Sequence, residues 1–123
     1  MLRGIRGAIT VSADSEQEIA AATREMLTQI VARNHTATSD IAAATFSLTS
    51  DLCAAFPAAA ARALGWTQVP MLCHQELPVP DSLPRCIRVL VLWNTDKVQD
   101  QIQHVYLRDA TRLRPDWAGR PQD

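Results

Sequence analysis

The amino-acid sequence predicts an α+β domain, in which one long and one short helix cover a single mixed β-sheet. Strand-like and helix-like segments follow one another in the order strand, long helix, strand, short helix and then three strands, without an internal repeat. The chain has 123 residues, of which 47% are hydrophobic, and this suits one compact domain with its own core. We place this domain at residues 1–117 and expect a flexible C-terminal tail at 118–123.

The N-terminal quarter of the chain predicts a strand followed by a long helix. Residues 2 to 11 alternate loosely between apolar and other side chains, which is typical of a strand. Ser15 and Glu18 form a capping-box pattern, and the apolar residues that follow recur with helical spacing. We therefore expect a helix over residues 15 to 33, ended by Asn34, that lies on the sheet because its apolar face must be covered.

The middle of the chain predicts a strand, a short helix and a second strand. Residues 41 to 49 contain threonines, an isoleucine and a phenylalanine, which favour a strand. Pro57 suits the first position of a helix and Gly65 suits its end, so we expect a helix at 57 to 64. The run "VPMLCHQE" at 69 to 76 predicts a buried strand.

The C-terminal part begins with the proline-rich residues 78 to 84, which predict a loop. "CIRVLVLWNT" at 86 to 95 is the strongest strand pattern in the chain. A turn or short helical piece in "TDKVQDQIQ" and a last strand in "HVYLRDATRLR" should follow. Both "PMLC" and "CIRVLVLW" are apolar on both alternations, as expected when both faces of a sheet are buried, and a partner subunit could supply the second cover.

Composition and charge disfavour several classes of protein. Twelve basic and thirteen acidic side chains nearly balance, so no nucleic-acid surface is indicated. No apolar run approaches the roughly 20 residues that span a bilayer, so we expect no membrane partner. Cys53, Cys73 and Cys86 are odd in number and widely spaced, and no secretory leader precedes them. A disulfide scaffold is therefore disfavoured, and we expect a cytoplasmic protein.

The common signatures of catalytic and metal sites are missing from the sequence. Cys73 and His74 are adjacent, so on a strand they point to opposite faces, and neither a Cys-x-x-Cys nor a His-x-x-x-His pair occurs. A structural thiol and a rim histidine are favoured over a metal site. The four glycines cannot build a phosphate cradle, and no Gly-x-Ser-x-Gly elbow is present.

Arginines inside apolar segments raise the main chemical question. Arg3 and Arg6 lie in "RGIRGAITV", and Arg88 interrupts "CIRVLVLW". Burying a guanidinium without an anionic partner is unfavourable, so each buried arginine needs an anion. Arg88 could pair with Glu76 for purely structural reasons, and Arg6 could lie at a strand edge with its charge in water.

Two further residues have simple structural readings. Tyr106 shares a strand face with His104, and the two could form a half-exposed surface. Arg114 lies beside Pro115 near the end of the chain, where a frayed tail is the default.

Five segments occur in the order and spacing of one known family: "RGIRGAITV", "FPAAAARALGW", "VPMLCHQE", "CIRVLVLWNT" and "QDQIQHVYLRDATRLRPD". Across about residues 3 to 117 the sequence resembles the AroH-type chorismate mutases. The resemblance implies a small α+β subunit that packs as a homotrimer into a pseudo-α/β-barrel, with sites at the subunit interfaces. It also implies conversion of chorismate into prephenate in phenylalanine and tyrosine biosynthesis, with no metal and no cofactor.

The resemblance also assigns roles to individual residues. Arg88 matches the arginine that faces the ether oxygen of the substrate, and Arg6 matches the one that grips a carboxylate. Tyr106 matches the phenol at the same end, and Glu76 matches the carboxylate that accepts a hydrogen bond from the ring hydroxyl. Cys73 is expected on the same strand face as Glu76. Secondary positions are matched by Phe56, Arg62, Leu113 and Arg114.

Some positions depart from the family pattern or stay unassigned. Arg3 has no counterpart in the family site. Ala59 stands where some relatives carry a lysine, which leaves one rim charge in doubt.

The chemistry explains why arginine would suffice for this reaction. An intramolecular [3,3] rearrangement needs neither a nucleophile nor a proton transfer. The protein must hold a folded conformer and place a cation where negative charge grows on the ether oxygen. Two other classes stay open: a non-catalytic module that binds a small carboxylate metabolite, and a purely trimeric interaction protein.

Overall fold

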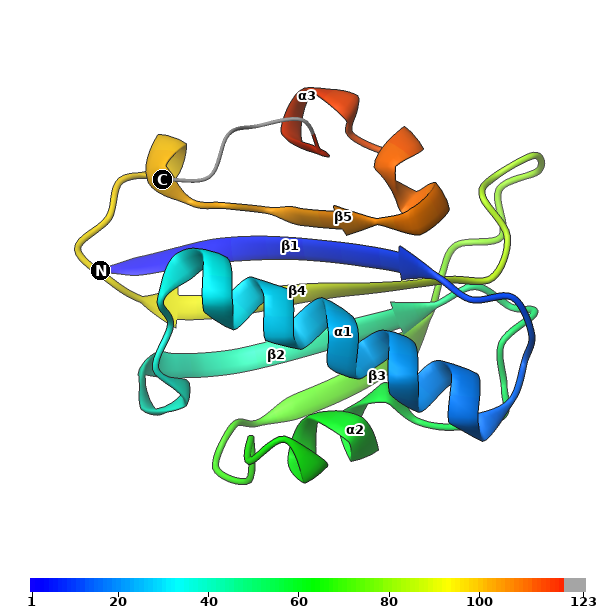
Figure 1. Ribbon diagram of the computed structural model, residues 1–123, viewed down its shortest axis with the longest axis horizontal. Helices are drawn as coiled ribbons and strands as arrows, with labels where there is room; N and C mark the ends of the chain where they lie inside the picture. The colour runs from blue at the N-terminus through cyan, green and yellow to red at the C-terminus, as the bar shows by residue number, and fades with distance from the viewer. Residues whose placement is uncertain (119–123) are drawn as a thin grey trace.

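A five-stranded mixed sheet forms the centre of the computed structural model, which describes residues 1–118 (Figure 1). The strand order is β3-β2-β4-β1-β5. The strands are β1 (Leu2–Thr10), β2 (Ile41–Leu48), β3 (Met71–Gln75), β4 (Cys86–Asn94) and β5 (Val105–Leu107). The pairs β1/β4 and β2/β4 are antiparallel, and the pairs β1/β5 and β2/β3 are parallel. The predicted mixed sheet is confirmed.

Helices α1 (Glu16–Asn34) and α2 (Pro57–Ala63) lie on the same face of this sheet (Figure 1). Shorter helical pieces are η1 (Thr38–Asp40), η2 (Gln99–Gln101), η3 (Arg108–Arg112) and α3 (Pro115–Ala118). The predicted helices over 15 to 33 and 57 to 64 are confirmed to within a residue or two. We call the sheet face away from α1 and α2 the outer face.

Local sequence explains where α1 begins. The hydroxyl of Ser15 accepts a hydrogen bond from the backbone N–H of Glu18 at 3.1 Å, as an N-cap should. The return bond of a capping box is not formed, because the Ser15 N–H donates to the carbonyl of Ala13 at 3.1 Å. Half of the predicted capping box is therefore present.

The core lies between α1 and the sheet. Large apolar side chains of the helix are fully buried there: Ile19, Met26, Leu27 and Ile30. A Cβ added at Gly7 of β1 would come within 2.9 Å of Ile30 and 3.0 Å of Val89, so only glycine lets the helix approach the sheet this closely. Burial of this face is what holds α1 on the sheet.

The outer face is only partly covered in a single subunit. On this face Leu90 of β4 and Leu72 of β3 both pair with Thr45 in the strand register, and their exposed fractions are 43% and 64%. The apolar alternation of β4 predicts burial on both faces, and residues 1–118 leave Leu90 and Leu72 without a full second cover.

Two predictions for the later elements need correction. The predicted buried strand at 69 to 76 is the edge strand β3, which is mostly exposed because only β2 pairs with it. The last strand is only three residues long, because Arg108 takes a left-handed conformation (φ 56°) that turns the chain into η3. Helix α3 was not predicted. Apart from Ala118 at its end, the predicted tail at 118–123 lies outside the described residues.

Candidate functional site

The strand register brings four side chains into one row across the outer face. Ser47 of β2 pairs with Arg88 of β4, Arg88 pairs with Ala8 of β1, and Ala8 pairs with Tyr106 of β5. Paired residues share a face, so the four side chains lie side by side. Ala8 has the smallest of the four side chains, so little side chain fills the space between Arg88 and Tyr106.

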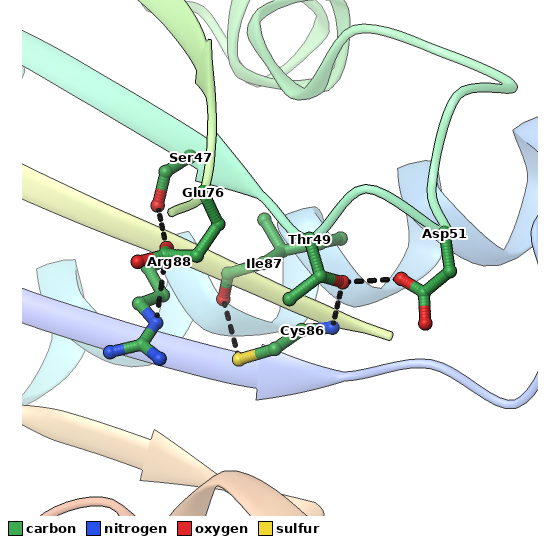
Figure 2. A network of polar contacts seen from close by, with 7 residues as sticks. All are labelled: Ser47, Thr49, Asp51, Glu76, Cys86, Ile87 and Arg88. Carbon is green, nitrogen blue, oxygen red and sulfur yellow. Dashed lines mark hydrogen bonds and ion pairs between the residues drawn. The ribbon is translucent and has the colours of Figure 1, made fainter. Parts of the chain in front are cut away.

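Arg88 and Glu76 contact each other at one end of this row (Figure 2). Arg88 Nε lies 3.3 Å from Glu76 Oε2, and the two side chains are 24% and 23% exposed. The approach is not aligned as a hydrogen bond, and within residues 1–118 no N–H of the Arg88 guanidinium donates to a carboxylate. Glu76 thus partly balances the charge of Arg88, but the N–H groups of the Arg88 guanidinium remain available for hydrogen bonds.

A groove opens beside this pair. Its volume is about 240 Å³, and it is lined by Arg6, Thr45, Ser47, Glu76, Arg88, Val89 and Leu90. We call it the arginine groove. Two permanent cations and one carboxylate therefore face the same open space, a suitable arrangement for a small anion that also carries a hydroxyl group.

Tyr106 lies next to Arg6, with the guanidinium carbon 5.9 Å from the ring centroid. Tyr106 is only 3% exposed, and its hydroxyl has no hydrogen-bond partner within the described residues. Burial raises the pKa of this phenol, although the charges of Arg6, Arg114 and Arg88 act in the opposite direction. Tyr106 is therefore a neutral donor without a partner, and the alternative of a half-exposed surface is wrong.

The segment after η3 packs over this end of the row. Leu113 and Trp117 pack against the small cluster that contains Tyr106 and Cys86. The guanidinium of Arg114 lies 3.5 Å from the centroid of the Trp117 ring and pairs with Asp116 at 2.8 Å. Arg114 is thus held in a defined position, and the alternative of a frayed tail is wrong for it.

The remaining predicted residues form a second group. Phe56, which is 72% exposed, and Cys73 both line a pocket of about 390 Å³ together with Cys53, Ala54, His74 and other residues. We call it the cysteine pocket. Arg62 lies exposed on α2. The arginine groove and the cysteine pocket share no lining residue.

The expectation that Cys73 shares a strand face with Glu76 is wrong. Cys73 pairs with Phe46, which is fully buried under the helices, whereas Glu76 reaches Ser47 and Arg88 on the outer face. The two residues are separated by an odd number of positions, and an odd spacing reverses the face.

Two residues of the site were missed by sequence reasoning. Ser47 contacts Glu76 directly, and only the β2/β4 register, which the sequence does not contain, could have revealed this. Trp117 stacks on His104 with the ring centroids 3.9 Å apart, and its place in a charged terminal segment gave no sign of this contact.

Cys86 is fully buried two positions before Arg88 on the same strand face. Burial raises the pKa of its thiol to about 11, although the neighbouring Arg88 charge acts to lower it. Cys86 is therefore a neutral packing residue beside the guanidinium rather than a reactive thiolate.

Two kinds of feature are absent from residues 1–118. No group of three or more His, Cys, Asp or Glu side chains there is arranged to hold a metal ion. No helix in the same range has the length and apolar character to span a bilayer.

Known proteins resemble this chain over nearly its whole length. The sequence model of the family described as Chorismate mutase type I matches residues 2–117. A protein named Chorismate mutase AroH from Thermus thermophilus is 56% identical over 117 residues, which cover 94% of this chain and 96% of that relative. The Chorismate mutase AroH of Bacillus subtilis (strain 168) is 50% identical over 117 residues, which cover 94% of this chain and 92% of the relative.

A solved structure gives the same result for the fold. The chorismate mutase from Clostridium thermocellum superposes with a TM-score of 0.89 at 46% sequence identity, and the match covers 90% of this chain and 99% of that one. Sequence and fold agree, and this chain belongs to the type I chorismate mutase family.

Proposed function

We propose that this chain, a chorismate mutase and therefore an isomerase of aromatic amino-acid biosynthesis, rearranges chorismate to prephenate in the arginine groove. The reaction breaks an ether C–O bond and forms a C–C bond within one molecule. One observation supports this location most strongly: Arg88 and Tyr106 flank the small Ala8, and both keep N–H or O–H groups that no described residue accepts.

The side chains divide the work by their position. Arg6 and Tyr106 bind a carboxylate of the substrate, since a charged fork and a neutral phenol next to each other both donate to an anion. Glu76 accepts a hydrogen bond from the ring hydroxyl. These contacts hold the two reacting ends together, which lowers the entropic part of the barrier.

Arg88 supplies the electrostatic part of catalysis. Its charge is permanent and fixed before the reaction, so it stabilises the negative charge that develops on the ether oxygen without reorganisation. Glu76 Oε2 approaches the guanidinium at Nε, and we assign the Nη groups to the substrate. No proton transfer or covalent intermediate is needed.

We further propose a homotrimer in which each site combines the arginine groove of one subunit with the cysteine pocket of the next. The two hollows share no lining residue, and each is open. Phe56, Leu72 and Leu90 are large apolar side chains left exposed in the single subunit, as expected of surfaces that a neighbour covers. In this arrangement Phe56 and Cys73 form a wall of the neighbour's site, and Arg62 lies at its rim. A cytoplasmic location remains a prediction.

The direct test is the loss of chorismate absorbance on addition of the purified protein in metal-free buffer, with prephenate identified as product. A non-catalytic carboxylate-binding module would bind chorismate without consuming it. The molar mass from light scattering should be three times that of one chain. A stable monomer that turns over chorismate would contradict the interface arrangement but not the activity.

A mixing experiment tests whether each site uses two subunits. Arg88→Ala disables the groove, and Phe56→Glu places a charge in the pocket that repels a dicarboxylate; both variants should be nearly inactive alone. Co-assembled in equal amounts, they should recover roughly a quarter of the parental activity, because that share of sites joins two intact halves. No recovery from co-assembled subunits would contradict a shared site.

A further inference from the structure

We infer that Ser47 is a positioning residue for the reaction: its hydroxyl group holds the Glu76 carboxylate so that Arg88 stays available to the substrate. This inference rests on the proposed function of the arginine groove. Ser47 Oγ donates to Glu76 Oε2 at 2.6 Å (Figure 2). The Ser47 side chain is only partly exposed and lines the groove.

The bond to Ser47 is the only aligned hydrogen bond that the Glu76 side chain accepts within residues 1–118. Arg88 Nε approaches the same oxygen, Oε2, but at 3.3 Å and out of line. Oε2 is thus occupied by protein groups, and Oε1 receives no hydrogen bond from the described chain. Ser47 therefore decides which carboxylate oxygen is offered to a substrate hydroxyl.

The backbone around Glu76 explains why it needs such a restraint. Glu76 follows the last residue of the edge strand β3, and one backbone hydrogen bond, from its N–H to the carbonyl of Leu48 at 2.7 Å, ties it to β2. β3 has a sheet neighbour on only one side. The side chain of Glu76 is held mainly by the groups that its oxygens contact. Ser47 is placed to provide such a contact, because Ser47 pairs with Arg88 in the register of β2 and β4.

Without the Ser47 hydroxyl, the favourable alternative for Glu76 is a bidentate pair with Arg88. Two parallel N–H···O bonds are the strongest arrangement that a carboxylate and a guanidinium can form. Such a pair would use at least one Nη group and neutralise the charge that the ether oxygen needs. Ser47 opposes this by fixing Oε2 at the Nε side of the guanidinium. The effect should therefore fall mainly on kcat, since Arg88 acts in the transition state.

The matched pair Ser47→Thr and Ser47→Val tests the inference, because the two side chains have nearly the same shape and differ by one hydroxyl group. Both are favoured in strands, so both should fold. Ser47→Thr should stay within about three-fold of the parent in kcat. Ser47→Val should lose about 10-fold or more, the usual effect of a lost hydrogen bond to a charged group. Ser12→Ala, which removes an exposed hydroxyl between β1 and α1, is the control and should match the parent.

A double-mutant cycle separates positioning from general packing. In a Glu76→Ala background, assayed at raised enzyme concentration, Thr and Val at position 47 should give the same rate within about two-fold, since no carboxylate remains to be held. Equal rates for the Thr and Val variants in the parent background would overturn the inference. The inference would also be overturned if Ser47→Val lowered the rate in the Glu76→Ala background as much as it does in the parent background. An inactive parent protein would instead refute the proposed function itself.

Discussion

Replacing Arg88 by lysine keeps the positive charge but changes where it lies. Lysine Nζ takes the place of the guanidinium carbon, so it ends about 1.3 Å, one C–N bond, short of the Nη atoms. It also lies next to Glu76 Oε2, which contacts Arg88 Nε at 3.3 Å in the parent, and an ammonium group can turn toward that carboxylate. The charge should therefore move away from the groove and toward Glu76.

The size of the effect follows from Coulomb's law. With an effective dielectric constant of about 20, moving a unit charge from about 2.8 to about 4.1 Å from an anion weakens the attraction by about 2 kcal/mol. Loss of a charge-assisted hydrogen bond to the transition state adds about 1.5 to 3 kcal/mol. The ether oxygen carries only part of a charge, so we expect kcat/KM to fall on the order of 10²- to 10³-fold.

Continuous measurement of chorismate absorbance gives this ratio directly. Arg24→Lys, which makes the same exchange at an exposed position of α1, should match the parent enzyme. Far-UV circular dichroism and thermal unfolding should show that both variants fold. An Arg88→Lys enzyme within a few-fold of the parent would refute the claim that the reach and shape of the guanidinium matter.

Three further results are expected. Arg6→Ala should raise KM by about 10- to 100-fold with a smaller change in kcat, because the lost bond binds a carboxylate in both ground and transition states; an unchanged KM would contradict this. Trp117→Ala should raise KM several-fold and Trp117→Phe should raise it less, because only the alanine variant lacks an aromatic ring that holds Arg114. Equal KM values for the two variants would show that the stacking of Arg114 on this ring is unimportant. The buried thiol of Cys86 has its pKa raised from 9.0 to about 11, so its neutral form stabilises the fold below pH 9 and this contribution is lost as the pH rises toward 11. In urea unfolding between pH 9 and pH 11, the free energy of unfolding of the parent should therefore fall by up to about 2 kcal/mol more than that of Cys86→Ala. Equal falls in the two proteins would disprove that the Cys86 thiol is neutral and buried.

Local signals in the sequence predicted the elements that depend on local interactions. Ser15 marks the start of α1, and Pro57 marks the start of α2, because a cap and a fixed φ act within one turn of the chain. The apolar run of β4 predicted the central strand. The exposure of β3 and the shortness of β5 escaped prediction, since they depend on the order of strands in the sheet and on the turn at Arg108.

The candidate site was predictable as a set of residues but not as a geometry. Arg6, Glu76, Arg88 and Tyr106 were assigned by family resemblance, and the register brings them to one face. The odd spacing of Cys73 and Glu76 could have placed them on opposite faces from the sequence alone, whereas Ser47 was missed because strand pairing cannot be read from the sequence.

Chemical rescue of the Arg88→Ala enzyme tests most directly whether a cation at this point accelerates the reaction. Guanidinium and urea have nearly the same planar shape and both donate N–H hydrogen bonds, but only guanidinium is charged. At equal millimolar concentrations, guanidinium should raise kcat/KM of this variant at least about ten-fold, and urea should leave it unchanged, because the stabilisation is electrostatic. Equal rates of the variant in guanidinium and in urea would contradict the account.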